Sequence, residues 1–94
     1  TAIVCYNDNV ALSLLNFCKA NDIRVPEDLS VVGIDNSKLS SVCEVPLTTV
    51  NHPHEELGKS AAEMLIELIR QPDRTVEDRI FDASLITRDS AIWY

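Results

Sequence analysis

Ala2-Ile3-Val4-Cys5 and Leu29-Ser30-Val31-Val32-Gly33-Ile34 are the two stretches that decide the fold of this chain. Both are apolar almost throughout, not at alternate positions, which is typical of a strand covered on both faces in a parallel sheet. About 28 residues separate Asn7, after the first stretch, from Asp35, after the second, and this is close to the length of one βαβ unit. The pattern therefore predicts an α/β fold with a parallel sheet flanked by helices.

Polar residues follow each predicted strand directly. Asn7 and Asp8 come after the first, and Asp35 and Asn36 after the second. Because parallel strands end at the same edge of a sheet, both pairs are expected at its carboxyl edge. Open α/β sheets bind small molecules there, so this edge is the predicted ligand site.

Composition limits the class of protein. The 94 residues carry a net charge of −7 and 46% apolar residues, which fits one small soluble domain or part of a larger one. The basic residues form no run, which argues against a nucleic-acid surface. No stretch has the length of a membrane span or the pattern of a signal peptide. The abrupt start on a strand suggests a fragment of a longer protein.

Cysteine usage favours a reducing compartment. Cys5, Cys18 and Cys43 are an odd number and fit neither a disulfide framework nor paired metal-ligand spacing. We therefore expect a cytoplasmic protein with no metal site.

The remaining elements follow from periodicity and from capping residues. A helix is expected from Asn9 to Ala20, with Asp8 as its N-cap and Asn21 as a left-handed C-cap. Gly33 indicates a close backbone approach or a bulge within its strand. Later elements are a loop at 37–46 with one helical turn, a strand at 47–51, a helix from Pro53 to Arg70 with an apolar stripe, and strand pieces at 79–81 and 83–87.

The edge residues suit hydroxyl recognition better than catalysis. They are rich in carboxamides and carboxylates, which can bond the neighbouring hydroxyls of a sugar: Asn7, Asp8, Asp35, Asn36, Asn51, His52 and His54. Asp35 is favoured as a ligand contact, whereas a helix cap already explains Asp8. An acid–base pair of Asp8 and Asp35 stays possible, but no activated nucleophile accompanies it. We expect no enzyme, no cofactor and no metal ligand.

The sequence resembles the effector-binding domain of LacI/GalR-family repressors over its whole length. The matching segments are Ala2 to Leu12, Arg24 to Asn36, Pro46 to Pro53 with Glu56-Leu57-Gly58 and Ala61-Ala62, and Leu85 to Ser90. Within the family, the chain looks most like the arabinose-responsive repressors of Gram-positive bacteria, which join a GntR-type winged helix to such a domain.

The resemblance implies a fold and a set of contacts. The fold is the two-lobed periplasmic-binding-protein-like (type I) fold, of which residues 1–94 would be the C-terminal portion, without the N-terminal lobe or the DNA-binding domain. Asn7 and Asp35 match residues that bond sugar hydroxyls. His52 stands where many members have a glutamine that reaches the ligand, and His54 where some place an aromatic ring. The helix after Pro53 would belong to the other lobe.

The expected function is therefore sensing of L-arabinose or a related pentose by a homodimeric transcriptional repressor. Operator DNA would be contacted only through the absent domain. Two alternatives stay open: the sugar-binding protein of a transport system, and a sugar-modifying enzyme that uses Asp8 and Asp35.

Overall fold

A computed structural model describes residues 1–92, and its chain divides into two compact units. One unit comprises residues 1–51 together with the C-terminal residues from Ser84, and it contains the sheet and the first helix. The other comprises His52–Ala83 and contains the second helix. The division falls directly after the third strand, so the candidate residues His52 and His54 lie in the second unit.

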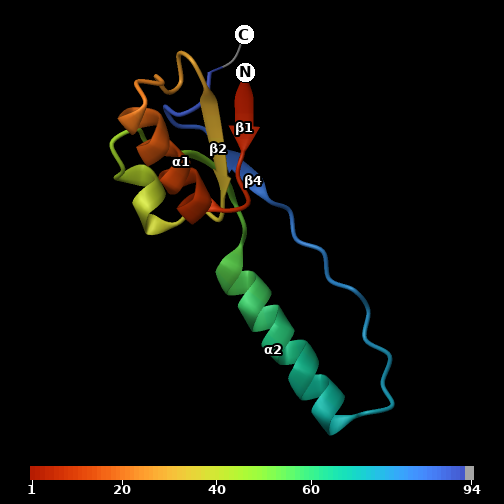
Figure 1. The fold of residues 1–94 in the computed structure, drawn as a ribbon. Helices are drawn as coiled ribbons and strands as arrows, with labels where there is room; N and C mark the ends of the chain where they lie inside the picture. Colours follow the sequence, from red (N-terminus) through yellow and green to blue (C-terminus); the bar gives the residue numbers. More distant parts are fainter. Residues whose placement is uncertain (93–94) are drawn as a thin grey trace. The chain divides into compact units, whose positions relative to one another are not determined.

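The sheet has four strands in the order β1-β2-β3-β4 (Figure 1). β1 (Ala2–Val4), β2 (Ser30–Ile34) and β3 (Thr48–Asn51) are parallel, whereas β4 (Ser84–Ile86) runs antiparallel to β3. The predicted α/β fold is confirmed. The strand piece expected at 79–81 is wrong: Ser84 already pairs with Asn51, where β3 ends, so the preceding residues have no neighbouring strand to pair with.

α1 (Asp8–Ala20) covers one face of the sheet and forms the core with it. The buried apolar cluster contains Cys5, Ala11, Val31 and Leu47, and Leu14 and Leu15 of α1 pack against it. These helix positions repeat at the three- and four-residue spacing of an amphipathic helix. The helical turn expected between β2 and β3 is present as the 3-10 helix η1 (Lys38–Ser41).

The predicted N-cap of α1 is displaced by one residue, whereas the predicted C-cap is at its position with a different conformation. The N-cap is Asn7, whose Oδ1 accepts a hydrogen bond of 2.9 Å from the N–H of Val10. Asp8 is instead the first helical residue, because its carboxylate has partners in the protein interior, described below. Asn21 is the C-cap, as predicted, but its φ of −113° is not left-handed; the next residue, Asp22, takes the left-handed conformation with a φ of 56°.

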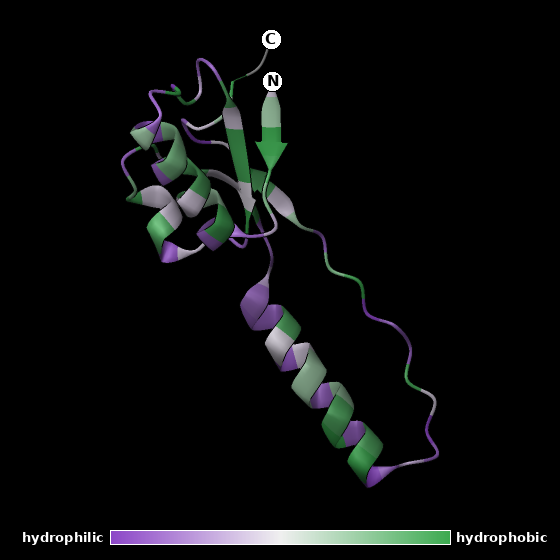
Figure 2. Ribbon diagram, in the orientation of Figure 1, coloured by the Kyte–Doolittle hydropathy of each residue, from purple (hydrophilic) through white to green (hydrophobic). Residues whose placement is uncertain are grey.

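Among the described residues, the second face of the sheet is covered over Thr48, which is 2% exposed, and open at β1. Val4 pairs with Val32, and Val32 with Thr48, so these side chains share the face opposite the core. Val4 is 67% exposed, and a shallow apolar hollow of about 190 Å³ lies on this face beside Leu85. Burial of β1 on both faces was therefore a wrong expectation for this part of the chain. Figure 2 shows β1 in hydrophobic colours.

The unit formed by residues 52–83 contains α2 (His54–Arg70) and an extended return segment. Pro53, the predicted first helical residue, is instead the N-cap, and the helix begins one residue later at His54. Arg79 tethers the return segment to the helix, donating to Ser60 Oγ at 3.1 Å and pairing with Glu63 at 3.4 Å. No residue of α2 is buried, and its large apolar side chains are exposed: Leu57, Leu65, Ile66, Leu68 and Ile69. Neither α1 nor α2 is long and apolar enough to cross a membrane.

Candidate functional site

The carboxyl edge of the sheet holds the polar residues that the sequence singles out. Asn7 follows β1, Asp35 follows β2, and Asn51 ends β3. The structure brings two of these strand ends together, because the amide nitrogen of Asn36 donates to Asn51 Oδ1 at 3.2 Å. Asn7 already uses its Oδ1 as the helix cap, which leaves its amide nitrogen, Nδ2, for a contact with a ligand.

Asp35 and Asn36 form a left-handed turn at this edge. Their φ angles are 112° and 51°, values that residues other than glycine rarely adopt. Two such residues in succession persist only where their surroundings hold them, and this kind of strain collects at ligand sites. We call residues 35–37 the edge turn.

Three consecutive backbone donors hold the edge turn. The N–H of Asp35 donates to the carbonyl of Val50 at 2.9 Å, and the N–H of Asn36 donates to Thr49 Oγ1 at 3.2 Å. The N–H of Ser37 donates to Asp8 Oδ2 at 2.7 Å. Each partner belongs to β3 or to the start of α1, so the turn is fixed by the fold around it.

Asp8 is a structural residue of this site. Its side chain is 1% exposed, and its Oδ1 accepts a hydrogen bond of 2.6 Å from Thr49 Oγ1. Gly33 makes room for it, because a Cβ at position 33 would overlap Asp8 Oδ1 and crowd Leu47. A carboxylate enclosed in this way bonds protein donors, so the acid–base pair of Asp8 and Asp35 has no support in the structure.

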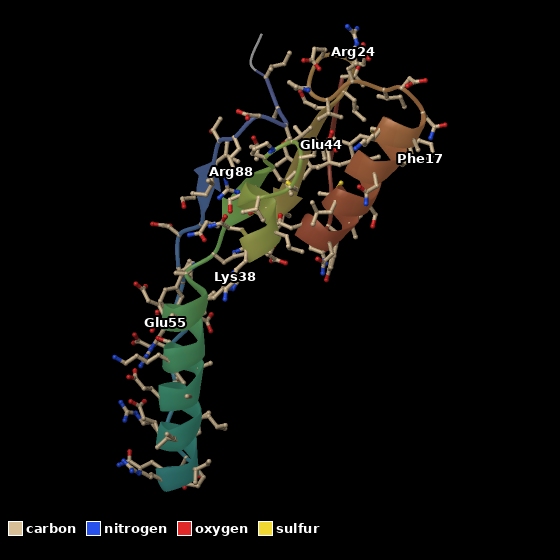
Figure 3. All side chains as sticks on the ribbon, turned by 90° about the vertical axis from the view of Figure 1, so that its left-hand side faces the viewer. Phe17, Arg24, Lys38, Glu44, Glu55 and Arg88 are labelled. Carbon is tan, nitrogen blue, oxygen red and sulfur yellow. The ribbon has the colours of Figure 1, made fainter. Side chains whose placement is uncertain are left out.

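Arg88 is a residue of this site that the sequence analysis did not single out. Its guanidinium donates to Asn36 Oδ1 at 2.9 Å, to Ser40 Oγ at 2.8 Å and to the carbonyl of Leu47 at 2.9 Å. Figure 3 labels Arg88, which lies just after β4. The signal available in the sequence was a single cation two residues after the apolar pair Leu85-Ile86.

The two histidines lie beside each other in the second unit. Their ring centroids are 5.6 Å apart with an interplanar angle of 68°, an edge-to-face contact. His52 is half-buried and His54 is exposed. Within residues 1–92, no group of histidine, cysteine and carboxylate side chains is arranged to hold a metal ion.

Comparison with known proteins finds one domain family and transcriptional repressors as relatives. Residues 1–91 match the periplasmic binding protein-like domain family. An arabinose metabolism transcriptional repressor of Halalkalibacterium halodurans is 48% identical over 95 residues, covering 96% of this chain and 25% of the relative. The HTH-type transcriptional repressor PurR of Aliivibrio fischeri is 40% identical over 94 residues, covering 98% of this chain and 27% of the relative.

Solved structures agree with these relatives. The transcriptional regulator CelR in complex with cellobiose superimposes with a TM-score of 0.90 at 32% identity, over 96% of this chain and 28% of the other. The chain thus spans about a quarter of the length of the curated relatives it matches. These relatives are transcriptional regulators and not enzymes.

Proposed function

The chain belongs to the family of periplasmic binding protein-like domains, in its LacI/GalR branch, and on that premise we propose that it is the C-terminal portion of the effector-binding domain of a sugar-responsive transcriptional repressor. The edge turn carries this proposal. A strained pair of polar residues, fixed by a buried carboxylate at the carboxyl edge of a parallel sheet, suits the binding of a small polar molecule.

The proposed contacts are Asn7, Asp35, His52 and His54. The first two follow strands at the carboxyl edge, and a carboxylate and an amide are acceptor and donor groups suited to vicinal hydroxyls. His52 and His54 begin the second unit, and in the proposal they contact the effector in the intact protein. No cofactor or metal takes part.

L-Arabinose or a related pentose is the proposed effector. The support is the 48% identity with the arabinose metabolism repressor of Halalkalibacterium halodurans. The comparable identity with the repressor PurR widens the range of effectors, and the CelR complex holds cellobiose. A panel of sugars is therefore the appropriate probe.

The proposed protein is longer than this chain. The exposed part of the second face at β1 and the exposed apolar side of α2 offer surface for further chain, and the relatives are about four times as long. In the proposal, a cytoplasmic homodimer contacts operator DNA through a separate domain. A sugar that binds one lobe arrangement more tightly than another shifts the population and so changes the fit to DNA.

One observation counts against each of the two alternative functions. A sugar-binding protein of a transport system shares the fold, but the relatives named above are transcriptional regulators. A sugar-modifying enzyme needs Asp8 to reach its substrate, and Asp8 is enclosed.

Titration calorimetry of the intact protein with L-arabinose, D-ribose, D-xylose and cellobiose tests the proposal, together with operator binding with and without each sugar. We expect saturable binding of at least one pentose, no turnover of it, and altered operator affinity. A protein that binds none of these sugars, or consumes one, contradicts the proposal.

A further inference from the structure

Arg88 connects the end of the sheet with the edge turn. It has three acceptors: Asn36 Oδ1 in the edge turn, Ser40 Oγ in η1, and the carbonyl of Leu47, the residue just before β3. Arg88 and Asn36 are 52 positions apart in the sequence, so only the folded chain joins them. Its backbone N–H also donates to Thr48 Oγ1 at 2.9 Å, which places the residue firmly against β3.

The guanidinium determines how the side chain of Asn36 is oriented. An arginine can only donate, so the amide oxygen of Asn36 must face it and the amide nitrogen must face away. That nitrogen donates to Asn51 Oδ1 at 3.2 Å. Asn36 is thus held between Arg88 on one side and the end of β3 on the other.

The hydrogen bonds to the side chain of Asn36 also constrain the backbone conformation of the edge turn. Asn36 has a φ of 51° and follows Asp35, whose φ is 112°. The three acceptors of Arg88 are uncharged oxygens, so these contacts are directional hydrogen bonds and not ion pairs. Directional bonds fix the orientation of Asn36 as well as its distance from the half-buried guanidinium. A side chain that fixes Asn36 also fixes the peptide from which Asp35 extends.

We propose that Arg88 is a positioning residue for the effector: it holds Asn36, and through Asn36 it presets the left-handed turn that presents Asp35 to the ligand. The proposal rests on the proposed function, because it takes Asp35 as a sugar contact. Arg88 itself touches no ligand in this account. Its loss lowers affinity by letting the turn leave the binding conformation, so part of the binding energy is used to restore that conformation.

A double-mutant cycle on the intact protein tests the proposal. Arg88→Met removes the donors and keeps a long side chain, and Asn36→Gly removes the steric penalty of a positive φ together with the contact to Arg88. With L-arabinose as the probe in calorimetry, Arg88→Met should weaken binding about tenfold in the wild-type background. In the Asn36→Gly background the same change should cost less than about twofold.

Two further variants keep the result interpretable. Arg88→Lys retains the charge but not the planar fork, and it should lose affinity while the protein stays folded; it replaces Arg88→Met in the cycle if that variant fails to fold. Arg24→Met is the matched control, because Arg24 pairs with Asp28 at 2.7 Å in the loop before β2, and it should bind sugar as the wild type does.

Distinct outcomes separate this proposal from the proposed function. Equal loss in both backgrounds would mean that Arg88 acts through general packing, and unchanged affinity would mean that it does not act on the site; either overturns the positioning role. A wild-type protein that binds neither L-arabinose nor any other sugar of the panel overturns the proposed function first, and the positioning role with it.

Discussion

At the scale of single residues, the site depends on Asp35, a residue with two separable properties. Its carboxylate is the proposed acceptor for sugar hydroxyls, and its φ of 112° is a conformation that glycine adopts more easily. Substitutions can remove the carboxylate with or without relieving the backbone, so they distinguish ligand contact from strain.

Asp35→Ala and Asp35→Gly in the intact protein should both weaken sugar binding by about 1.5–3 kcal/mol, the contribution of a hydrogen bond to a charged group. They should differ in stability, because only glycine relieves the positive φ, by about 1 kcal/mol or more in favour of Asp35→Gly. Calorimetry and thermal unfolding of the two variants measure both effects. Sugar affinity equal to the wild type in both would remove Asp35 from the site.

Gly33 gives a second prediction at this scale. A methyl group there would meet Asp8 Oδ1 and Leu47, so Gly33→Ala should destabilise the protein by about 1–3 kcal/mol, as overpacking of a core does. Gly58 is the matched control: nothing lies within 4 Å of a Cβ at that helical position, and Gly58→Ala should stabilise by about 0.5–1 kcal/mol. Urea unfolding of the two variants should therefore shift in opposite directions, and shifts of the same sign would contradict this account of Gly33.

At the scale of elements, α1 begins with a residue that has two proposed roles. Asn7 caps the helix through its Oδ1, and the resemblance assigns it a sugar contact. The two roles use different atoms of the same amide, so one side chain can serve both.

Substitutions at Asn7 separate the roles. Serine is as good an N-cap as asparagine but is shorter and has no amide group, so Asn7→Ser should keep stability within a few tenths of a kcal/mol and lose sugar affinity. Asn7→Ala should lose affinity as well and cost about 1 kcal/mol of stability. Denaturation and calorimetry measure the pair. If Asn7→Ser binds sugar as the wild type does, Asn7 is a cap alone.

At the scale of the whole molecule, α2 presents an apolar side that no described residue covers. Leu65 is 58% exposed and Ile69 is 69% exposed. Each large apolar side chain of this kind gains about 1.5–3 kcal/mol when it is buried, so a few of them equal the stability of a small domain.

The 94 residues produced alone should therefore associate through α2 and bind no sugar measurably, because in the proposal the N-terminal lobe of the longer protein supplies the other contacts to the sugar. Size-exclusion chromatography with light scattering and a titration with L-arabinose measure both. The double substitution Leu65→Glu with Ile69→Glu should return the chain to a monomer. A wild-type monomer would contradict the prediction that the apolar side of α2 is an association surface. Tight sugar binding by this chain would contradict the prediction that further contacts to the sugar lie outside it.

The sequence by itself determined the elements of this protein and the edge at which its site lies. Apolar runs and helical periodicity are local properties, so they predicted β2, α1 and the placement of Asp35 after a buried strand. The error in the N-cap was also local, since Asn7 and Asp8 can each cap a helix and only their other partners decide between them.

Only the tertiary structure decided what holds the site. Asp8 bonds Thr49 across 41 positions of the sequence, and Arg88 bonds Asn36 across 52. Periodicity carries no information about such pairs, because their donors and acceptors meet only after the strands have aligned. The positive φ of Asp35 is of the same kind. An aspartate rarely adopts a positive φ by its own preference. Asp35 adopts it because β3, α1 and Arg88 together fix the turn.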